Sequence, residues 1–156
     1  MVWLNCITAF RNNLKGEGAA MVHVNYLAVL VAAIAVFVLG WLWYSPLLFF
    51  KPWMRLRGMD PVAAMAGAKM PAGKLFIELA RCLVLAYVIG RFVALVGVSS
   101  WMGAIHFGLF LWIGFPVILL TGSVLWENIP WKVAAIHAGD WLVKMLVISI
   151  IVSLWH

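Results

Sequence analysis

The chain has 156 residues, of which 67% are hydrophobic and only 10% are charged. A soluble domain carries about 25% charged residues, so a chain of this composition could not cover its surface in water. The net charge of +6 does not indicate a nucleic-acid partner, because the basic residues flank apolar stretches, as membrane insertion requires. Composition therefore excludes a soluble globular protein and indicates an integral membrane protein whose first partner is the lipid bilayer.

The apolar stretches predict membrane-spanning helices. Only helices and closed barrels satisfy all their backbone hydrogen bonds in lipid. The stretches are continuous and do not alternate with polar residues, which favours helices over a barrel. About 20 residues are needed to cross a hydrocarbon core of ~30 Å. We predict an all-α fold, an integral membrane four-helix bundle, with spans at about residues 24–43, 75–98, 103–122 and 133–155.

The first 20 residues are more polar than the apolar spans after them. Residues 1–20 are interpreted as an N-terminal extension, with two alternatives open: a native part of the protein or a segment outside its core. Residues 21–156 are interpreted as the four-span membrane domain, and Met21 is an alternative start.

The first span, residues 24–43, contains no charged residue and ends beside Trp43 and Tyr44. A signal peptide is the alternative, but its apolar region would be shorter and would end at small residues. A retained helix is therefore favoured. Ser45 and Pro46 come next, and a proline disfavours helical dihedrals in the residue before it, so we expect the helix to stop or kink there.

A basic connection, residues 47–74, joins the first two spans. It holds five Lys or Arg residues against one acid, Asp60. We predict that its first half lies in the headgroup zone, where Trp53 anchors it and where anionic lipid is a candidate partner. Asp60 and Pro61 are typical of a helix start, which predicts a short helix to about Lys69.

Charge also predicts orientation. The connection 97–101 between the second and third spans holds no Lys or Arg. The positive-inside rule then places the basic connection in the cytoplasm and both termini outside.

The later spans are interrupted by polar or helix-breaking residues. Pro116 lies inside the third span and predicts a kink that frees a backbone carbonyl, a feature that can line a site. A polar, aromatic loop, residues 126–132, precedes the fourth span and supplies Trp131 as a second interfacial anchor. The second span carries three charged residues: Glu78, Arg81 and Arg91.

A weak internal repeat links two tryptophans to nearby prolines. Trp43 lies three residues before Pro46, and Trp112 lies four residues before Pro116. A parallel repeat of two helical hairpins would explain the pattern, and so would chance similarity between tryptophan-rich membrane segments.

One block of the sequence resembles a known family. Gly40 to Phe49 reads GWLWYSPLLF, and Asn25 to Leu30 reads NYLAVL. Together they resemble a family of small bacterial membrane proteins defined as domain of unknown function 1761. The resemblance covers about residues 22–156. It implies a four-helix protein of the bacterial inner membrane, and it implies no established activity.

The fourth span carries the most unusual residues of the chain. His137, Asp140 and Lys144 are spaced three and four residues apart, so they share one face of a helix. A charge at the bilayer centre costs ~2.5–3.5 kcal/mol on insertion scales, so this face should contact protein or water. By the helical rise, Asp140 lies roughly 10 Å and Arg81 roughly 9 Å from the cytoplasmic starts of their spans. We predict a buried polar cluster of Glu78, Arg81, His137, Asp140 and Lys144, which Tyr44 and Ser45 approach from the cytoplasmic side.

This cluster has two interpretations. Hydrogen bonds between membrane helices average only ~0.6 kcal/mol, yet they fix which helices pair. Intramembrane ionisable residues also mark proton and ion paths, and His137 titrates near neutral pH. The first interpretation predicts a structural or accessory membrane component, and the second predicts a small proton- or ion-coupled transporter or channel subunit.

Other site chemistry finds less support in the sequence. Haem bound by two histidines would need His106 and His137 at one depth, but we expect them near opposite membrane surfaces. The sequence holds no Cys-x-x-Cys metal site and no standard catalytic motif. We therefore predict no cofactor and no metal, and an enzyme is the least favoured class. Four spans make a thin bundle, so a homo-oligomer is a further expectation.

Overall fold

A computed structural model describes residues 23–66 and 71–155 of the chain. The proposed extension, residues 1–20, lies outside the described residues, as does Met21. In the described part, four helical rods are long and apolar enough to span a membrane. The rods are α2 (Tyr26–Trp43), α5 (Ala72–Val96), the continuous series α6 (Trp101–Trp112), η1 (Ile113–Val117) and α7 (Ile118–Trp126), and α8 (Trp131–Leu154). The predicted all-α four-helix membrane bundle is confirmed.

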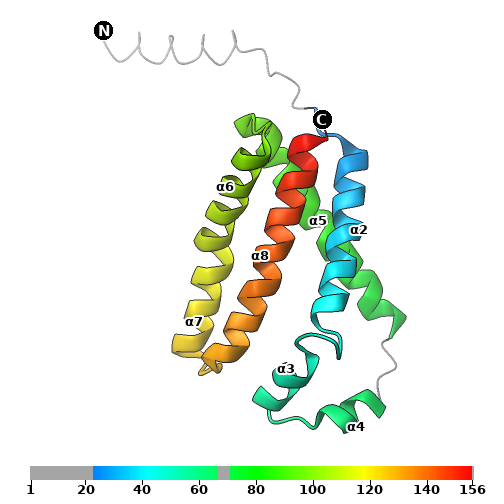
Figure 1. The fold of residues 1–156 in the computed structure, drawn as a ribbon, viewed down its shortest axis with the longest axis vertical. Coiled ribbons are helices and arrows are strands. Elements are labelled where there is room, and N and C mark those ends of the chain that lie inside the picture. The colour runs from blue at the N-terminus through cyan, green and yellow to red at the C-terminus, as the bar shows by residue number, and fades with distance from the viewer. Residues whose placement is uncertain (1–22, 67–70, 156) are drawn as a thin grey trace, which may run out of the picture.

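Helix α8 is the centre of the bundle. It packs against α2, α5 and α6, whereas α6 and α7 pack chiefly against α8. Figure 1 shows α8 between α2 and the α6–α7 rod, with α5 crossing behind. The first and last described residues lie at the same end of the bundle (Figure 1).

Two short helices occupy the basic connection at the other end of the bundle (Figure 1). They are α3 (Phe50–Leu56) and α4 (Pro61–Ala66). The predicted helix start is confirmed, because the Asp60 carboxylate accepts a hydrogen bond from the Val62 amide at 3.0 Å. The predicted end near Lys69 lies outside the described residues.

Local signals set the ends of the spans. The Asn25 side chain caps α2 by accepting from the amides of Leu27 and Ala28, as expected for an N-cap asparagine. Gly97 ends α5 with a φ of 74°, in the left-handed region that glycine enters freely. The Ser100 hydroxyl then caps α6.

Three of the predicted spans begin earlier in the structure than expected, the fourth at Trp131 instead of residue 133. The second span begins at Ala72 instead of residue 75, because Pro71 already has the extended backbone of an N-cap. The third runs over 101–126 instead of 103–122. Its polar end stays helical, and the Thr121 hydroxyl satisfies the Val117 carbonyl at 2.7 Å.

Pro116 is accommodated without a break in the rod. It lies buried in the π-helical turn η1, which continues directly into α7. A π-turn shifts the hydrogen-bond ladder by one residue and so absorbs a group that cannot donate.

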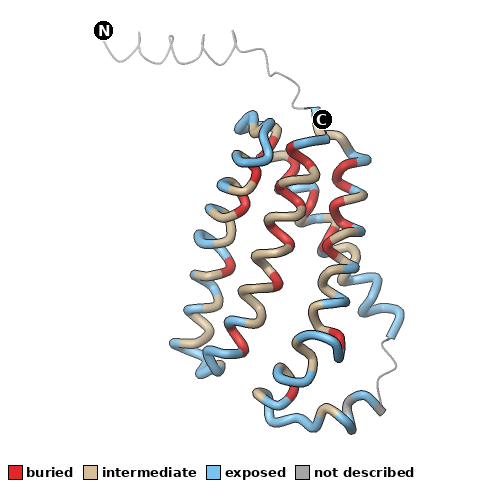
Figure 2. The backbone as a smooth tube through the Cα atoms, viewed as in Figure 1, coloured by how far each residue is buried: buried red, intermediate tan, exposed pale blue. Residues whose placement is uncertain are grey.

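Buried residues of α2, α5 and α8 (Figure 2) form the core, and several of them have small side chains. Ala32, Ala33 and Ala86 are fully buried there, together with Val36 and Ile148. Because lipid is as apolar as these side chains, close packing drives association instead of hydrophobic burial.

Gly108 shows the same close approach between α6 and α8. A Cβ at this position would lie 3.2 Å from the Met145 carbonyl oxygen. Gly108→Leu should therefore destabilise the bundle by about 1–3 kcal/mol through overpacking, measured as a lower thermal midpoint in detergent. Gly122→Leu on the same rod is the control, because a Cβ there meets nothing within 4 Å. Equal shifts for the two variants would contradict this packing.

Candidate functional site

The centre of the site is an ion pair within α8. Lys144 Nζ lies 2.9 Å from Asp140 Oδ2, one helical turn away, and the two side chains are only 10% and 9% exposed. A carboxylate one turn before a lysine is the favourable order for such a pair. The pair therefore brings opposite charges together inside the bundle, where little of either side chain is exposed.

Helix α5 extends the charges from this pair to the surface. Lys144 Nζ lies 3.6 Å from Glu78 Oε1, and Arg81 donates to Glu78 Oε2 at 2.6 Å. The side chains of Glu78 and Arg81 are 37% and 63% exposed. We call these four residues, Glu78, Arg81, Asp140 and Lys144, the charge chain. Its two acids and two bases balance.

The prediction that Arg81 is buried was wrong. Cys82 and Ala86 occupy the buried face of α5, and Arg81 lies beside that face, where its side chain extends outward. A long arginine can cover apolar surface with its stem while its charged end stays exposed.

Gly40 allows the backbone of α2 to pack directly against Lys144 of the charge chain. A Cβ on Gly40 would lie 3.1 Å from both Cε and Nζ of Lys144. The lysine stem therefore lies directly against the α2 backbone, and α2, α5 and α8 all meet at this one side chain.

His137, which was predicted to join the charged cluster, makes its hydrogen bonds to aromatic side chains instead. The Tyr44 hydroxyl lies 2.6 Å from His137 Nδ1, and the Trp53 indole donates to His137 Nε2 at 3.3 Å. An indole N–H can only donate, so Nε2 must accept, and the proton of a neutral imidazole then lies on Nδ1. Nδ1–H consequently donates to the Tyr44 oxygen. Burial raises the pKa of the Tyr44 hydroxyl above its ordinary value, so this group stays neutral.

Three indoles converge on one turn of α8, a feature that was not predicted from the sequence. Trp43 donates to the Ile136 carbonyl at 3.1 Å, and Trp112 donates to the Ala138 carbonyl at 2.8 Å. Trp53 binds His137 between them. A helical carbonyl keeps a second lone pair that can accept such a bond. We call Trp43, Trp53 and Trp112 the indole clamp.

The clamp gives the two tryptophans of the weak repeat a shared role. Trp43 at the end of α2 and Trp112 at the end of α6 donate to α8 carbonyls two residues apart, and α2 and the α6–α7 rod lie on opposite sides of α8 (Figure 1). Trp53, predicted as an interfacial anchor, has its indole N–H directed into the protein instead of being free for the headgroup zone.

Among the described residues, the remaining predicted site residues form no hydrogen bond or ion pair with the charge chain. Ser45 is buried in the turn after α2, and its hydroxyl has no hydrogen-bond partner among the described residues. Pro116 is buried in η1. Trp131 is exposed at the start of α8 and lies under the Lys132 ammonium, 5.8 Å from its ring centre. His106 binds the Met102 carbonyl near the start of α6, far along the bundle from His137 near the start of the antiparallel α8.

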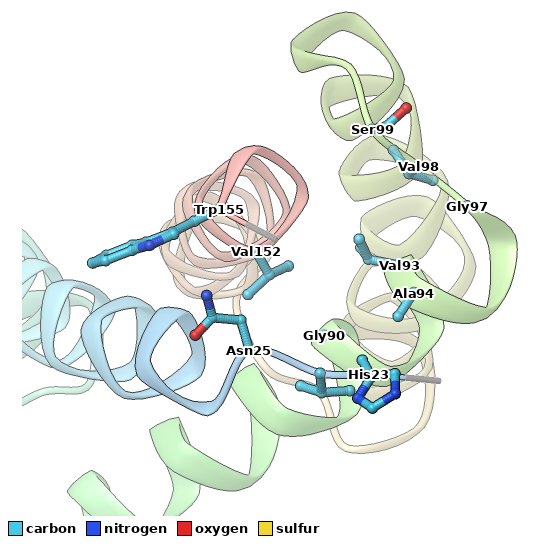
Figure 3. Close-up of a pocket in the computed structure, with 11 residues that line it drawn as sticks. His23, Asn25, Gly90, Val93, Ala94, Gly97, Val98, Ser99, Val152 and Trp155 are labelled. Carbon is cyan, nitrogen blue, oxygen red and sulfur yellow. The ribbon is translucent and has the colours of Figure 1, made fainter. Parts of the chain in front are cut away.

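Hollows open on the described part of the bundle. A groove of about 520 Å³ between α5 and α8 is lined in part by Glu78, Arg81 and Lys144. A smaller hollow of about 240 Å³ lies at the end where α2 begins and α8 ends (Figure 3). Asn25 lines this hollow, but its side chain is already used to cap α2. The groove is therefore the hollow that holds ionisable groups from the predicted cluster.

The described residues form four apolar rods, and the central rod carries a buried ion pair. This arrangement defines a helical membrane protein with a polar centre. The family described as Protein of unknown function (DUF1761) matches residues 27–153. The chain belongs to this family, and the resemblance inferred from its WYSPLLF block is confirmed. No curated protein and no solved structure matches the chain.

Gly139 makes the indole clamp sterically feasible. A Cβ there would lie 2.7 Å from Trp43 Cζ2, closer than side chains tolerate. Gly139→Ala should displace the Trp43 ring, break its bond to Ile136 and cost about 1–3 kcal/mol, read from the thermal midpoint in detergent. Gly122→Ala is the matched control, since its Cβ would lie in open space. A Gly139→Ala protein as stable as this control would refute the clamp.

Proposed function

We propose that this protein is a structural or accessory component of the membrane, and that its charge chain fixes how the spans pack. One observation carries the proposal: Lys144, with a side chain 10% exposed, contacts carboxylates from two helices. A charged residue within a span is costly unless it is paired. The lysine therefore selects an arrangement in which α5 and α8 both present an acid to it.

The charge chain supports this role by specifying how the helices pack, more than by adding to the free energy of unfolding. Buried ion pairs are weak sources of net stability, because desolvation offsets their attraction. Their best-attested use is to fix register between helices. In this bundle the apolar contacts between alanines and valines would tolerate sliding, whereas the position of Lys144 against Gly40 and Glu78 would not.

The wider setting is part of the same proposal. We place the protein in a bacterial inner membrane. The basic connection, which includes α3, lies on the cytoplasmic side, and both termini lie outside. The basic connection would attract anionic lipid. The α6–α7 rod is the least buried of the four, so it offers the face for a homo-oligomer.

The charge chain predicts an order of stabilities. Lys144→Met leaves Asp140 and Glu78 near each other without their shared cation, and should cost about 3 kcal/mol. Asp140→Asn should cost less, because Lys144 keeps Glu78. The double variant should be more stable than Lys144→Met alone, since it removes the acid that Lys144→Met leaves without a cation, whereas Glu78 keeps Arg81. Thermal unfolding in detergent measures all three.

Lys132→Met is the control for these variants, because Lys132 is exposed on the same helix. If Lys144→Met unfolds at the same temperature as this control, the proposed role of the charge chain fails.

A second candidate function is a proton or ion path. One observation favours it: the charge chain runs from the buried Asp140 to the exposed Arg81 without a gap longer than 3.6 Å. Carboxylates and bases in such a series can pass protons.

Proton flux into liposomes separates the two functions. A relay would give flux that Asp140→Asn abolishes and Lys132→Met retains, with helical content unchanged in both. Flux no higher than in empty liposomes would eliminate the relay and leave the structural role.

A further inference from the structure

The groove between α5 and α8 results from how the helices diverge. Only residues 97–100 separate α5 from α6, yet α6 packs along α8 while α5 packs against α2 and α8. In Figure 1, α5 crosses behind the bundle. It is near α6 at the end where residues 97–100 join the two helices, and it is far from the α6–α7 rod at its other end. Residues of α5 form most of the lining of a groove of about 520 Å³, and Trp141 and Lys144 of α8 complete it. Its volume is within the range of roughly 300–1,000 Å³ that is typical of ligand sites.

The lining of the groove divides into an apolar wall and a charged rim. Val84, Leu85 and Val88 of α5 line the wall, and Trp141 of α8 faces it. Val84 and Val88 are exposed, so apolar surface is open to an acyl chain. The rim is formed by Glu78 and Arg81, and Lys144 also lines the groove.

The rim carries one acid and one base that both remain accessible. Glu78 and Arg81 are 37% and 63% exposed, whereas Asp140 and Lys144 neutralise each other in the interior. A guanidinium has five N–H donors, and the Glu78 contact uses Nη1. The rest of the guanidinium fork suits a phosphate, which arginine binds in a bidentate manner. The carboxylate suits an ammonium.

We propose that this groove binds one zwitterionic phospholipid with a primary ammonium in its head group. Its phosphate contacts Arg81, its ammonium contacts Glu78, and one acyl chain lies along Val84, Leu85 and Val88. A net-anionic lipid fits less well, because the rim has no excess positive charge and Glu78 repels a second anion. This inference goes beyond the proposed structural role and does not depend on it.

The depth of the rim fits a head group. Helix α5 has 25 residues, or about 37 Å at the helical rise, which exceeds a hydrocarbon core of ~30 Å. Arg81 lies nine residues after Ala72, about 13 Å along the helix. If the excess length lies at this end, Arg81 is several ångströms inside the core boundary, and an extended arginine reaches the phosphates by snorkelling.

Lipid binding to the full chain tests the proposal. The purified protein in detergent is titrated with phosphatidylethanolamine, phosphatidylcholine or phosphatidylglycerol, and bound lipid is counted by native mass spectrometry. We expect phosphatidylethanolamine to bind about tenfold more tightly than either competitor. Phosphatidylcholine tests the ammonium, because its quaternary nitrogen has no N–H to donate.

Variants assign the contacts. Arg81→Gln should weaken phosphatidylethanolamine binding about tenfold, and Glu78→Gln should reverse the preference toward phosphatidylglycerol, since it leaves an unmatched cation. Val84→Trp places a bulky side chain on the apolar wall at an exposed position, and it should weaken the binding of all three lipids. Lys74→Gln is the matched control, because Lys74 is exposed on α5 and does not line the groove.

Three results would overturn the proposal, each judged on the binding that Val84→Trp removes, so that lipid on the basic connection is not counted: no preference among the lipids, a preference of the unmodified protein for phosphatidylglycerol, or equal binding by Arg81→Gln and Lys74→Gln. Circular dichroism of each variant ensures that lost binding is not lost fold. Because the thermal order of the Lys144 and Asp140 variants is measured separately, failure of lipid binding leaves the structural role intact.

Discussion

The contact of Lys144 with two carboxylates is the constraint on which the bundle depends. In lipid, apolar side chains gain little by leaving the solvent for each other, so alanine and valine packing brings helices together without fixing one register. A buried ammonium does fix the register. If one helix shifts, its carboxylate moves away from the ammonium, and an unpaired charge is left in a medium that solvates it poorly. Asp140 satisfies it within α8, Glu78 satisfies it from α5, and Gly40 gives it space against α2.

The indole clamp complements the charge chain at the end of the bundle where α8 begins. The charge chain joins α8 to α5, with α2 packed against it, whereas the clamp joins α8 to α2, α3 and α6. Both use the same few turns of α8, residues 136–144. This part of the central helix therefore contacts every other span, while its C-terminal half packs through small and β-branched side chains.

The sequence predicted the spans and the main ion pair, because both depend on short-range patterns. Hydropathy identifies a span directly, and the spacing of Asp140 and Lys144 places them on one helical face. The rise per residue also predicted that α5 and α8 bring their charges to similar depth. It could not predict which side of α5 faces α8, and for that reason Arg81 was wrongly assigned to the interior. The indole clamp was missed because tryptophans near span ends are usually interfacial, and their bonds to α8 exist only in the folded bundle.

The central claim is that Lys144 and Asp140 form a direct ion pair inside the bundle. The most direct measurement is solid-state NMR in lipid bilayers, with dipolar recoupling between the ¹⁵N-labelled Lys144 ammonium and the ¹³C-labelled carboxylate of Asp140. We predict strong dephasing, as expected for a nitrogen 2.9 Å from a carboxylate oxygen. An ammonium signal that shows no coupling to this carboxylate would contradict the claim.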